Sequence, residues 1–461
     1  MKLVYIFFLC LVPLEVGAQN IFRIACNGDL EKLDSALQSQ EINVLDDQGR
    51  NLLHWAAGCK KPEIVDYLVE KEIDFDLKDD ESNTPLHYAA DFGNAETLTQ
   101  MIALEADDEW TKSDGGQLLG LATQREDQEK IDILLAEGVE INSPNRRGST
   151  ALEIADRFGY DEMVDFLISK GADSSVLNKA LPEGKYMGEE PPGKVAKLFA
   201  PGFISTEEEE FGSVFNKAGD EFYFGVHKRG KSEIRFSELK NGRWTEPKAI
   251  LIHPEYGYND PFLSQDENRL YFISNHPISG KGEPKEDIDI WFVERQGSAW
   301  SKPIHAGWNI NTESQEYYIS FTEEGKMYFS SSRHASEDEK GWNLDIYTSE
   351  FKNGEFQPAI QLGSAINSDA YEADVFVDPK EEYVIFCSER DGGLGVGDLY
   401  ISFKDSQGNW SQAKNMGEKI NSSKYEYCPF VTEDGKYLFY TSNQDIYWIS
   451  TDIIQDLKNE R

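Results

Sequence analysis

Thr84-Pro85-Leu86-His87-Tyr88-Ala89-Ala90 is the stretch that decides the fold of the first part of the chain. Strings of the same pattern return at intervals of 33 residues, and their leucine and first alanine keep the same phase. The other copies are Asn51–Ala57, Gln117–Thr123 and Thr150–Asp156. A second apolar segment with helical spacing follows each string, and polar, turn-rich residues separate the copies. A fixed period of this length predicts helix pairs that stack on their neighbours.

These strings resemble the ankyrin family. Thr84–His87 matches the family's signature tetrapeptide in full, whereas Leu53-His54 and Leu152 match it in part. The resemblance covers about residues 20–175, and Ile21–Val44 adds an opening copy, which gives about five copies. It implies an all-α solenoid whose signature histidines, His54 and His87, hydrogen-bond neighbouring loops.

In this family the residue after the signature histidine usually points to the concave face, where partners bind. Trp55 and Tyr88 occupy this place, and Asp91 and Phe92 follow Tyr88 by one helical turn. Aromatic residues are common hot spots of protein interfaces, so these four are the candidate partner-binding residues. The alternative is ordinary packing of Trp55 and Tyr88 against the hairpin loops.

Beyond a segment rich in Pro and Gly, the pattern changes to short β-strands. One strand returns five times, about every 50 residues, which fits units of four short antiparallel strands. Its copies are Phe222–Phe224, Leu270–Phe272, Met327–Phe329, Val384–Phe386 and Leu438–Tyr440. Such units arranged radially form a β-propeller. The last unit stops after its third strand, and the segment Leu198–Thr206 is expected to supply the missing one.

The strand repeats closely resemble the WD40-like repeats of the TolB-type propeller, best at Ser388–Tyr400. Five blades follow from the count, and six is the usual number of that type. The predicted architecture is therefore multidomain, an all-α ankyrin solenoid followed by an all-β propeller. Its parts are a signal peptide (1–18), ankyrin repeats (19–177), a linker (178–195) and the propeller (196–457).

Acidic residues recur just before the innermost strand of the blades. Glu210, Glu372 and Glu426 share one phase and Glu316 lies one residue away, whereas Tyr258 replaces the acid in the second unit. Carboxylates that converge on a central channel could hold calcium. They could equally accept hydrogen bonds from backbone amides that hold blade to blade.

Two arginines form a second candidate group in the propeller. Arg333 and Arg390 each follow the same strand by a few residues. An arginine there could bind a carboxylate or an anionic sugar. The alternative is pairing with the aspartate that begins the next strand, Asp345 or Asp398.

The first residues are typical of a secretion signal. Lys2 precedes an apolar run over residues 3–14, and Val16 and Ala18 predict a cut before Gln19. A lipoprotein signal would need a small residue before Cys10, where Leu9 stands. We therefore expect an exported protein, periplasmic or secreted, and no later run is long enough to span a membrane.

Four cysteines remain after the cut. Cys26 and Cys59 occupy near-equivalent places of adjacent repeats. Because packed helices lie about 10 Å apart, we expect these two to be buried free thiols. The pairing of Cys387 and Cys428 stays open.

The 461 residues carry 84 acidic against 45 basic side chains, a formal net charge of −39. This charge repels phosphate backbones and excludes nucleic acid as a partner. It favours solubility, and the rival interpretation is attraction of metal ions or basic partners.

The leading hypothesis is an exported, non-enzymatic binding or scaffold protein of the cell envelope. The ankyrin face would hold a protein, and the propeller would hold a protein, a peptide or a glycan. No cofactor and no metal ligand set is expected. The alternatives are a glycosidase-like propeller with channel carboxylates as acid and base, and a calcium-stabilised structural module.

Overall fold

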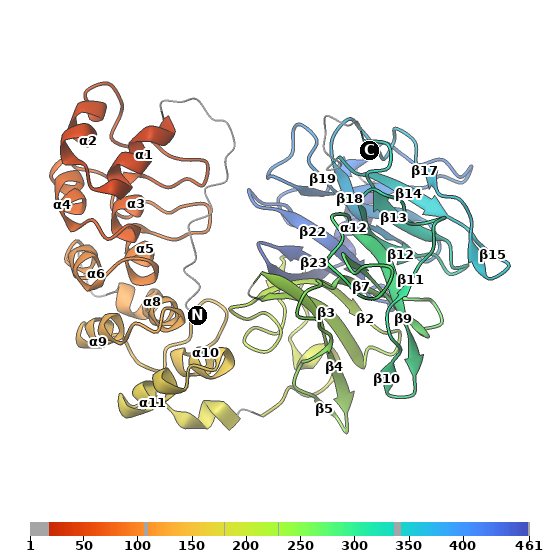
Figure 1. Cartoon of the computed structure of the whole chain (residues 1–461), viewed down its shortest axis with the longest axis horizontal. Coiled ribbons are helices and arrows are strands. Elements are labelled where there is room, and N and C mark those ends of the chain that lie inside the picture. The colour runs from red at the N-terminus through yellow and green to blue at the C-terminus, as the bar shows by residue number, and fades with distance from the viewer. Residues whose placement is uncertain (1–17, 106–108, 179, 229, 336–342, 460–461) are drawn as a thin grey trace. The chain divides into compact units, whose positions relative to one another are not determined.

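The computed structural model describes residues 18–105, 109–178, 180–228, 230–335 and 343–459. The chain divides into two compact units, residues 1–179 and 180–461, each with its own hydrophobic core (Figure 1). The predicted signal peptide, residues 1–18, lies outside the described residues except for Ala18.

The first unit consists of helix pairs (Figure 1). Five pairs occur within its described part, and one extra short helix, α7, precedes the fourth pair. The pairs are α1 (Ala18–Asn27) with α2 (Leu30–Leu37), α3 (Leu52–Gly58) with α4 (Pro62–Glu70), α5 (Pro85–Asp91) with α6 (Ala95–Ile102), α8 (Gly115–Gln124) with α9 (Gln128–Ala136), and α10 (Ala151–Phe158) with α11 (Asp161–Ser169); α7 spans Trp110–Ser113. First helices contact first helices of the next pair, which is the stacking that the 33-residue period predicts.

The signature histidines are structural, as predicted. The Nδ1 atom of His54 accepts a hydrogen bond from the backbone N–H of Asn51, at 3.2 Å. Its Nε2 atom therefore carries the proton and donates to the carbonyl of Asn83 in the next hairpin loop, at 3.1 Å. His87 closes the equivalent capping box with Thr84. Each histidine thus fixes the start of its own helix, and His54 also fixes the following loop.

The expectation of free thiols at Cys26 and Cys59 is wrong. The two residues form a disulfide, with 5.1 Å between their Cα atoms. Cys26 lies in the last turn of α1, and Cys59 is the C-cap of α3. The spacing of about 10 Å applies to the axes of packed helices. Residues on the facing sides of two adjacent helices come much closer than the axes do.

Part of the predicted linker, 178–195, packs on the second unit. It includes the 3₁₀ turn η2 (Lys185–Gly188). Met187 is buried, and the Tyr186 ring meets those of Phe215, Tyr437 and Trp448 with centroids 5.0–5.8 Å apart. The segment is therefore part of the propeller core.

The second unit is a five-bladed β-propeller, which confirms the count from sequence. Blade 1 contains β2 (Glu209–Phe215), β3 (Glu221–Lys228), β4 (Lys231–Lys240) and β6 (Lys248–Leu251); blade 2, β7 (Asn259–Leu263), β8 (Arg269–Ser274), β9 (Asp289–Gln296) and β11 (Ile304–His305); blade 3, β12 (Glu316–Phe321), β13 (Met327–Ser331), β14 (Asp345–Ser349) and β17 (Ile360–Gln361); blade 4, β18 (Glu372–Val377), β19 (Tyr383–Ser388), β20 (Asp398–Phe403) and β21 (Lys414–Asn415); blade 5, β22 (Glu426–Val431), β23 (Tyr437–Ser442), β24 (Asp445–Ser450) and β1 (Lys197–Leu198).

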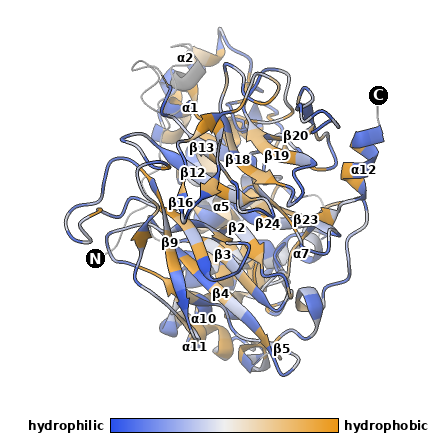
Figure 2. Ribbon diagram, turned by 90° about the vertical axis from the view of Figure 1, so that its right-hand side faces the viewer, coloured by the Kyte–Doolittle hydropathy of each residue, from blue (hydrophilic) through white to orange (hydrophobic). Residues whose placement is uncertain are grey.

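Short strand pieces extend blades 1 and 2, two more form a separate hairpin after β14, and a helix follows the last strand. The pieces are β5 (Arg243–Trp244), β10 (Ala299–Trp300), β15 (Phe351–Lys352) and β16 (Glu355–Phe356), and the helix is α12 (Asp452–Asn459). Apolar residues concentrate in the strands, and the connecting loops are mostly polar (Figure 2).

A strand from before the first blade closes the ring, as predicted, but it spans Lys197–Leu198, so only Leu198 of the predicted segment Leu198–Thr206 lies in it. β1 pairs antiparallel with β24, with Leu198 opposite Tyr447. The innermost strands β2, β7, β12, β18 and β22 contact one another in a complete cycle. Closure pairs the exposed edge that the fifth blade would otherwise leave open.

Each innermost strand carries a β-bulge at the same place. The pairing register shifts there in all five blades. One residue of each bulge has a positive φ, between 37° and 54°. These five bulge residues are Gly212, Asp260, Tyr318, Asp374 and Cys428.

Candidate functional site

Trp55 is held against the preceding hairpin loop. Its Nε1 atom donates to Oδ2 of Asp46, at 2.9 Å. Arg50 pairs with the same carboxylate, at 2.7 Å, and its guanidinium lies 4.5 Å from the centroid of the Trp55 ring. The indole is half-buried, so part of its surface still faces solvent in a fixed orientation.

Tyr88 repeats this arrangement one helix pair later. Its hydroxyl donates to Oδ2 of Asp79, at 2.8 Å, and the side chain is half-buried. One turn on, Asp91 pairs with Arg125 at 2.6 Å, and the guanidinium of Arg125 lies 4.5 Å from the centroid of the Phe92 ring. The four predicted residues therefore pack on their surroundings, and the three aromatic ones present partly exposed rings.

Lys130 supports the end of this surface, a role that was not predicted from the sequence. The side chain is 1% exposed. Its ammonium donates to the backbone carbonyls of Ala90, Asp91 and Gly93, at 2.6, 3.0 and 3.3 Å. Burial lowers the pKa of Lys130. A lysine in the first turn of an amphipathic helix is common in proteins, so the sequence alone does not indicate this role.

Each predicted channel glutamate is bonded to the loop that leads into its own strand. We call such a glutamate, together with the Ser or Thr four residues earlier, a carboxylate clamp. Glu372 is fully buried and accepts hydrogen bonds from the backbone N–H and hydroxyl of Ser368, at 2.7 and 2.6 Å. The hydroxyl of Ser388 donates to it as well, at 2.8 Å. The same contacts with a Ser or Thr four residues earlier recur at Glu210, Glu316 and Glu426. These four carboxylates hold the entry to the innermost strands of blades 1, 3, 4 and 5.

The two candidate arginines join these clamps. Arg390 pairs with Glu372 at 2.8 Å, and Arg333 pairs with Glu316 at 3.4 Å. The alternative that named Asp345 and Asp398 as the partners is therefore wrong. The reason is the turn after the second strand, which directs each guanidinium back toward the start of the innermost strand of its own blade. Arg390 also donates to the carbonyl of Ile366, at 2.7 Å.

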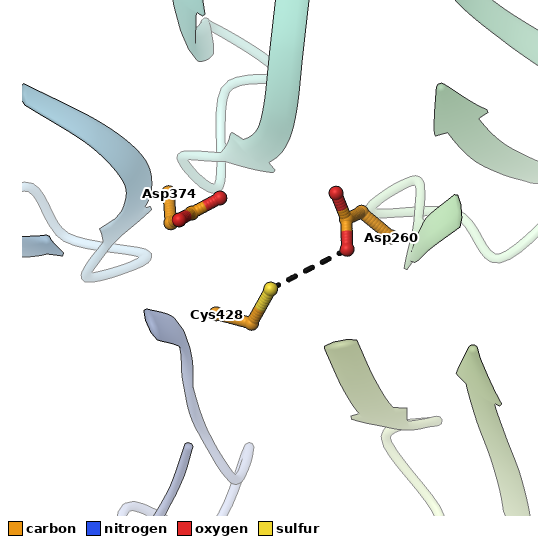
Figure 3. A group of neighbouring side chains, drawn as sticks. All are labelled: Asp260, Asp374 and Cys428. Carbon is orange, nitrogen blue, oxygen red and sulfur yellow. Dashed lines mark hydrogen bonds between the residues drawn. The ribbon is translucent and has the colours of Figure 1, made fainter. Parts of the chain in front are cut away.

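Ring closure brings three of the bulge residues together. Asp260, Asp374 and Cys428 come from blades 2, 4 and 5, and their ligand atoms lie within 4.8 Å of one another (Figure 3). The exposed fractions are 7%, 6% and 1%. The thiol of Cys428 donates to Oδ1 of Asp260, at 3.3 Å. Among the described residues, this is the one group of His, Cys, Asp and Glu side chains close enough to hold a metal ion.

Neighbouring bulge residues shape this group. A Cβ atom at Gly212 would lie 2.7 Å from Oδ1 of Asp260, so the glycine leaves room for that carboxylate. Tyr318 is buried and donates its hydroxyl to the carbonyl of Pro429, at 2.9 Å. The hydroxyl is thus bonded to the backbone beside Cys428.

Burial dominates the electrostatics of the group. It raises the pKa of Asp260 to about 6, although the hydrogen bond from Cys428 opposes the shift. Burial and the repulsion of Asp260 raise the pKa of Asp374 well above its ordinary value. Burial, followed by the charges of the two aspartates, also raises the pKa of the Cys428 thiol. Each charged form is therefore costly unless a cation lies beside it.

This group was not predicted from the sequence, although a signal was present. The bulge residue lies two positions after the recurring acid, or after Tyr258 in the second blade. Its side chain differs between blades, so a search for repeated residue types passes over it. If the five blades are assumed to form a closed ring, the bulge positions of all blades face its centre, and the three side chains are then expected to meet there.

One comparison with known families gives a match. The model of a family described as ankyrin repeats (3 copies) matches residues 21–109 and 91–178. No curated protein matches the chain. The N-terminal region therefore consists of ankyrin repeats, and the WD40-like or TolB kind of the propeller stays a prediction. No helix in the described ranges has the length and apolar character needed to cross a membrane.

Proposed function

We propose that this chain is an exported, non-enzymatic binding protein whose ankyrin repeats hold a protein partner. Ankyrin repeats and propellers are both folds that serve protein–protein interaction. The observation that carries the proposal is the row of half-buried aromatic rings at Trp55, Tyr88 and Phe92. Arg50 and Arg125 lie over two of these rings.

The row has the chemistry and the rigidity of an interface centre. Trp, Tyr and Arg dominate the binding energy of protein interfaces. The bonds of Trp55 to Asp46 and of Tyr88 to Asp79 fix both side chains before a partner arrives. Less side-chain entropy is then lost on binding. The net charge of −39 favours a partner with a basic surface, because it speeds the encounter at low salt.

Two features support export to the cell envelope or beyond. Lys2, the apolar run over residues 3–14 and the small residues before Gln19 have the order of a cleaved secretion signal. The disulfide between Cys26 and Cys59 is of a kind that persists in oxidising compartments and is rare in the cytosol. The propeller would hold a second partner, which is a protein, a peptide or a glycan.

A capture experiment with the full chain tests the ankyrin face. Wild type, the double variant Trp55→Ala/Tyr88→Ala and the control Tyr67→Ala are used to capture partners from an envelope extract. Tyr67 is a matched control because it lies on α4, in the second-helix layer, with its hydroxyl bonded to Asp34. We expect the double variant to bind its partner about tenfold or more weakly, and Tyr67→Ala to bind as wild type does.

Circular dichroism must show the same helical signal for all three proteins, so that a loss of binding is not a loss of fold. If the double variant keeps every partner of the wild type at equal affinity, the ankyrin face has a different role.

A further inference from the structure

The three side chains at the centre of the propeller come from separate blades. Asp260 follows the first residue of β7, Asp374 lies in β18 and Cys428 lies in β22. Each occupies the bulge of its strand, with a φ between 50° and 54°. Gly adopts such a backbone most readily, Asp does so less readily and Cys rarely, so the surrounding ring holds these residues in place. Strained backbone of this kind is common where side chains are aimed at a ligand.

Asp374 supplies the observation that points to a ligand. The residue is 6% exposed, and its carboxylate is directed toward Asp260 and Cys428 (Figure 3). No hydrogen bond or ion pair reaches this carboxylate from any residue in the described part of the chain. A buried carboxylate without a partner costs several kcal/mol, by rough estimate, so native structures seldom keep one.

The charges of the group are not balanced by the protein. Neither Asp260 nor Asp374 forms an ion pair with a Lys, Arg or His of the described ranges. The clamps nearby differ in this respect, because Glu316 and Glu372 each have an arginine. Two carboxylates and a thiol at one buried point therefore lack a positive charge that a bound cation would provide.

We propose that Asp260, Asp374 and Cys428 bind one divalent metal ion of the zinc class in the centre of the propeller. A thiolate ligand selects zinc and similar borderline-soft ions over calcium and magnesium, which take oxygen ligands in larger number. The three protein ligands, with a water molecule as the fourth, complete the tetrahedral set that zinc prefers. The ion joins blades 2, 4 and 5 and stabilises the closed ring.

The geometry requires a modest adjustment. Ligands on a tetrahedral zinc ion lie about 3.3–3.8 Å apart, given bond lengths of about 2.0–2.3 Å. The present ligand atoms lie within 4.8 Å of one another, so they close in by roughly 1 Å around the ion. Side-chain torsions can supply this movement while the bulges stay in place. On binding, the thiol proton and any carboxylate proton pass to solvent.

The metal content of the full chain tests the proposal. Four proteins are produced with zinc in the medium: wild type, Asp374→Asn, Cys428→Ser and the control Cys387→Ser. Each is titrated with a chelator of known zinc affinity, and mass spectrometry measures the metal that stays bound. Cys387 is a matched control because it is a second buried free thiol, on β19, outside the group. We expect about one zinc ion per chain in wild type and Cys387→Ser, and an affinity at least 10- to 100-fold weaker in the other two.

Cobalt provides a second readout, because its absorption reports directly whether a cysteine is bound to the metal. Cobalt-loaded wild type should show the thiolate-to-metal charge-transfer absorption of a cysteine ligand, and Cys428→Ser should lack it. Asp374→Asn keeps the shape of the side chain, so it serves if Cys428→Ser fails to fold. Wild type that retains no metal, or variants that retain as much as wild type, would overturn the proposal.

Discussion

Asp46 and Asp79 show at the residue scale how one carboxylate in a hairpin loop positions an aromatic side chain of the following helix. Asp46 accepts a hydrogen bond from the indole N–H of Trp55, and Asp79 accepts one from the hydroxyl of Tyr88, each nine positions later in the sequence. The two hypotheses for Trp55 and Tyr88, packing on the loops and contact with a partner, are therefore compatible. The same bond that packs the ring also orients the part of it that stays exposed.

The buried histidines predict a pH dependence of the ankyrin repeats. Burial lowers the pKa of both His54 and His87. The unfolded chain takes up protons below about pH 6.5, whereas the folded repeats take them up only at lower pH. Their contribution to the free energy of unfolding is therefore complete above pH 6.5 and decreases as the pH falls toward the folded pKa values.

Urea titrations followed by the helical circular dichroism signal measure this effect between pH 7.5 and 5.5. His87→Asn should be less stable at pH 7.5 and should show a shallower loss of stability toward pH 5.5 than wild type. The control His227→Asn, in β3 of the propeller, should keep the wild-type slope. Equal slopes for His87→Asn and wild type would show that protonation elsewhere controls the stability of the repeats.

At the scale of elements, the innermost strands of the propeller share one backbone design but carry different residues at the bulge. Each begins at a carboxylate clamp, except in blade 2, and bulges two residues later. The clamp fixes where the strand enters the ring. The bulge then turns one side chain toward the other blades. This repetition explains why residues distant in sequence, such as Asp260 and Cys428, come into contact.

Closure of the ring by β1 predicts a large effect at Phe199, the next residue along the chain. Its N–H donates to the carbonyl of Ile446, at 2.8 Å, and its ring is fully buried. Ring centroids of Phe222 in blade 1 and of Phe439 and Trp448 in blade 5 lie 4.9–5.5 Å away. Phe199→Ala should lower the free energy of unfolding of the propeller by about 3–5 kcal/mol, because it leaves a cavity where the first and last blades meet.

Denaturant titrations followed by tryptophan fluorescence measure this loss. Phe351→Ala is the matched control, because Phe351 lies in the short strand β15 and is 39% exposed. A loss for Phe199→Ala no larger than that of the control would mean that β1 is dispensable for closure.

At the scale of the whole molecule, the sequence predicts the fold well because both units are repeats. A recurring Leu and Ala every 33 residues indicates stacked helix pairs, and five copies of one strand indicate five blades. The disulfide and the central group were not predicted, since both depend on distances between repeats. The Cys26–Cys59 contact depends on which helix faces meet, and the meeting of Asp260, Asp374 and Cys428 depends on ring closure. Periodicity carries neither kind of information.

The central claim is that the chain consists of two repeat arrays, each of which folds around its own core. Differential scanning calorimetry of the full chain tests it most directly, with and without reductant and with Phe199→Ala. We expect two transitions. Reduction of the Cys26–Cys59 disulfide should lower only the ankyrin transition, because a disulfide of this loop length contributes about 2–4 kcal/mol. Phe199→Ala should lower only the propeller transition, and a single transition that both changes lower together would contradict the account.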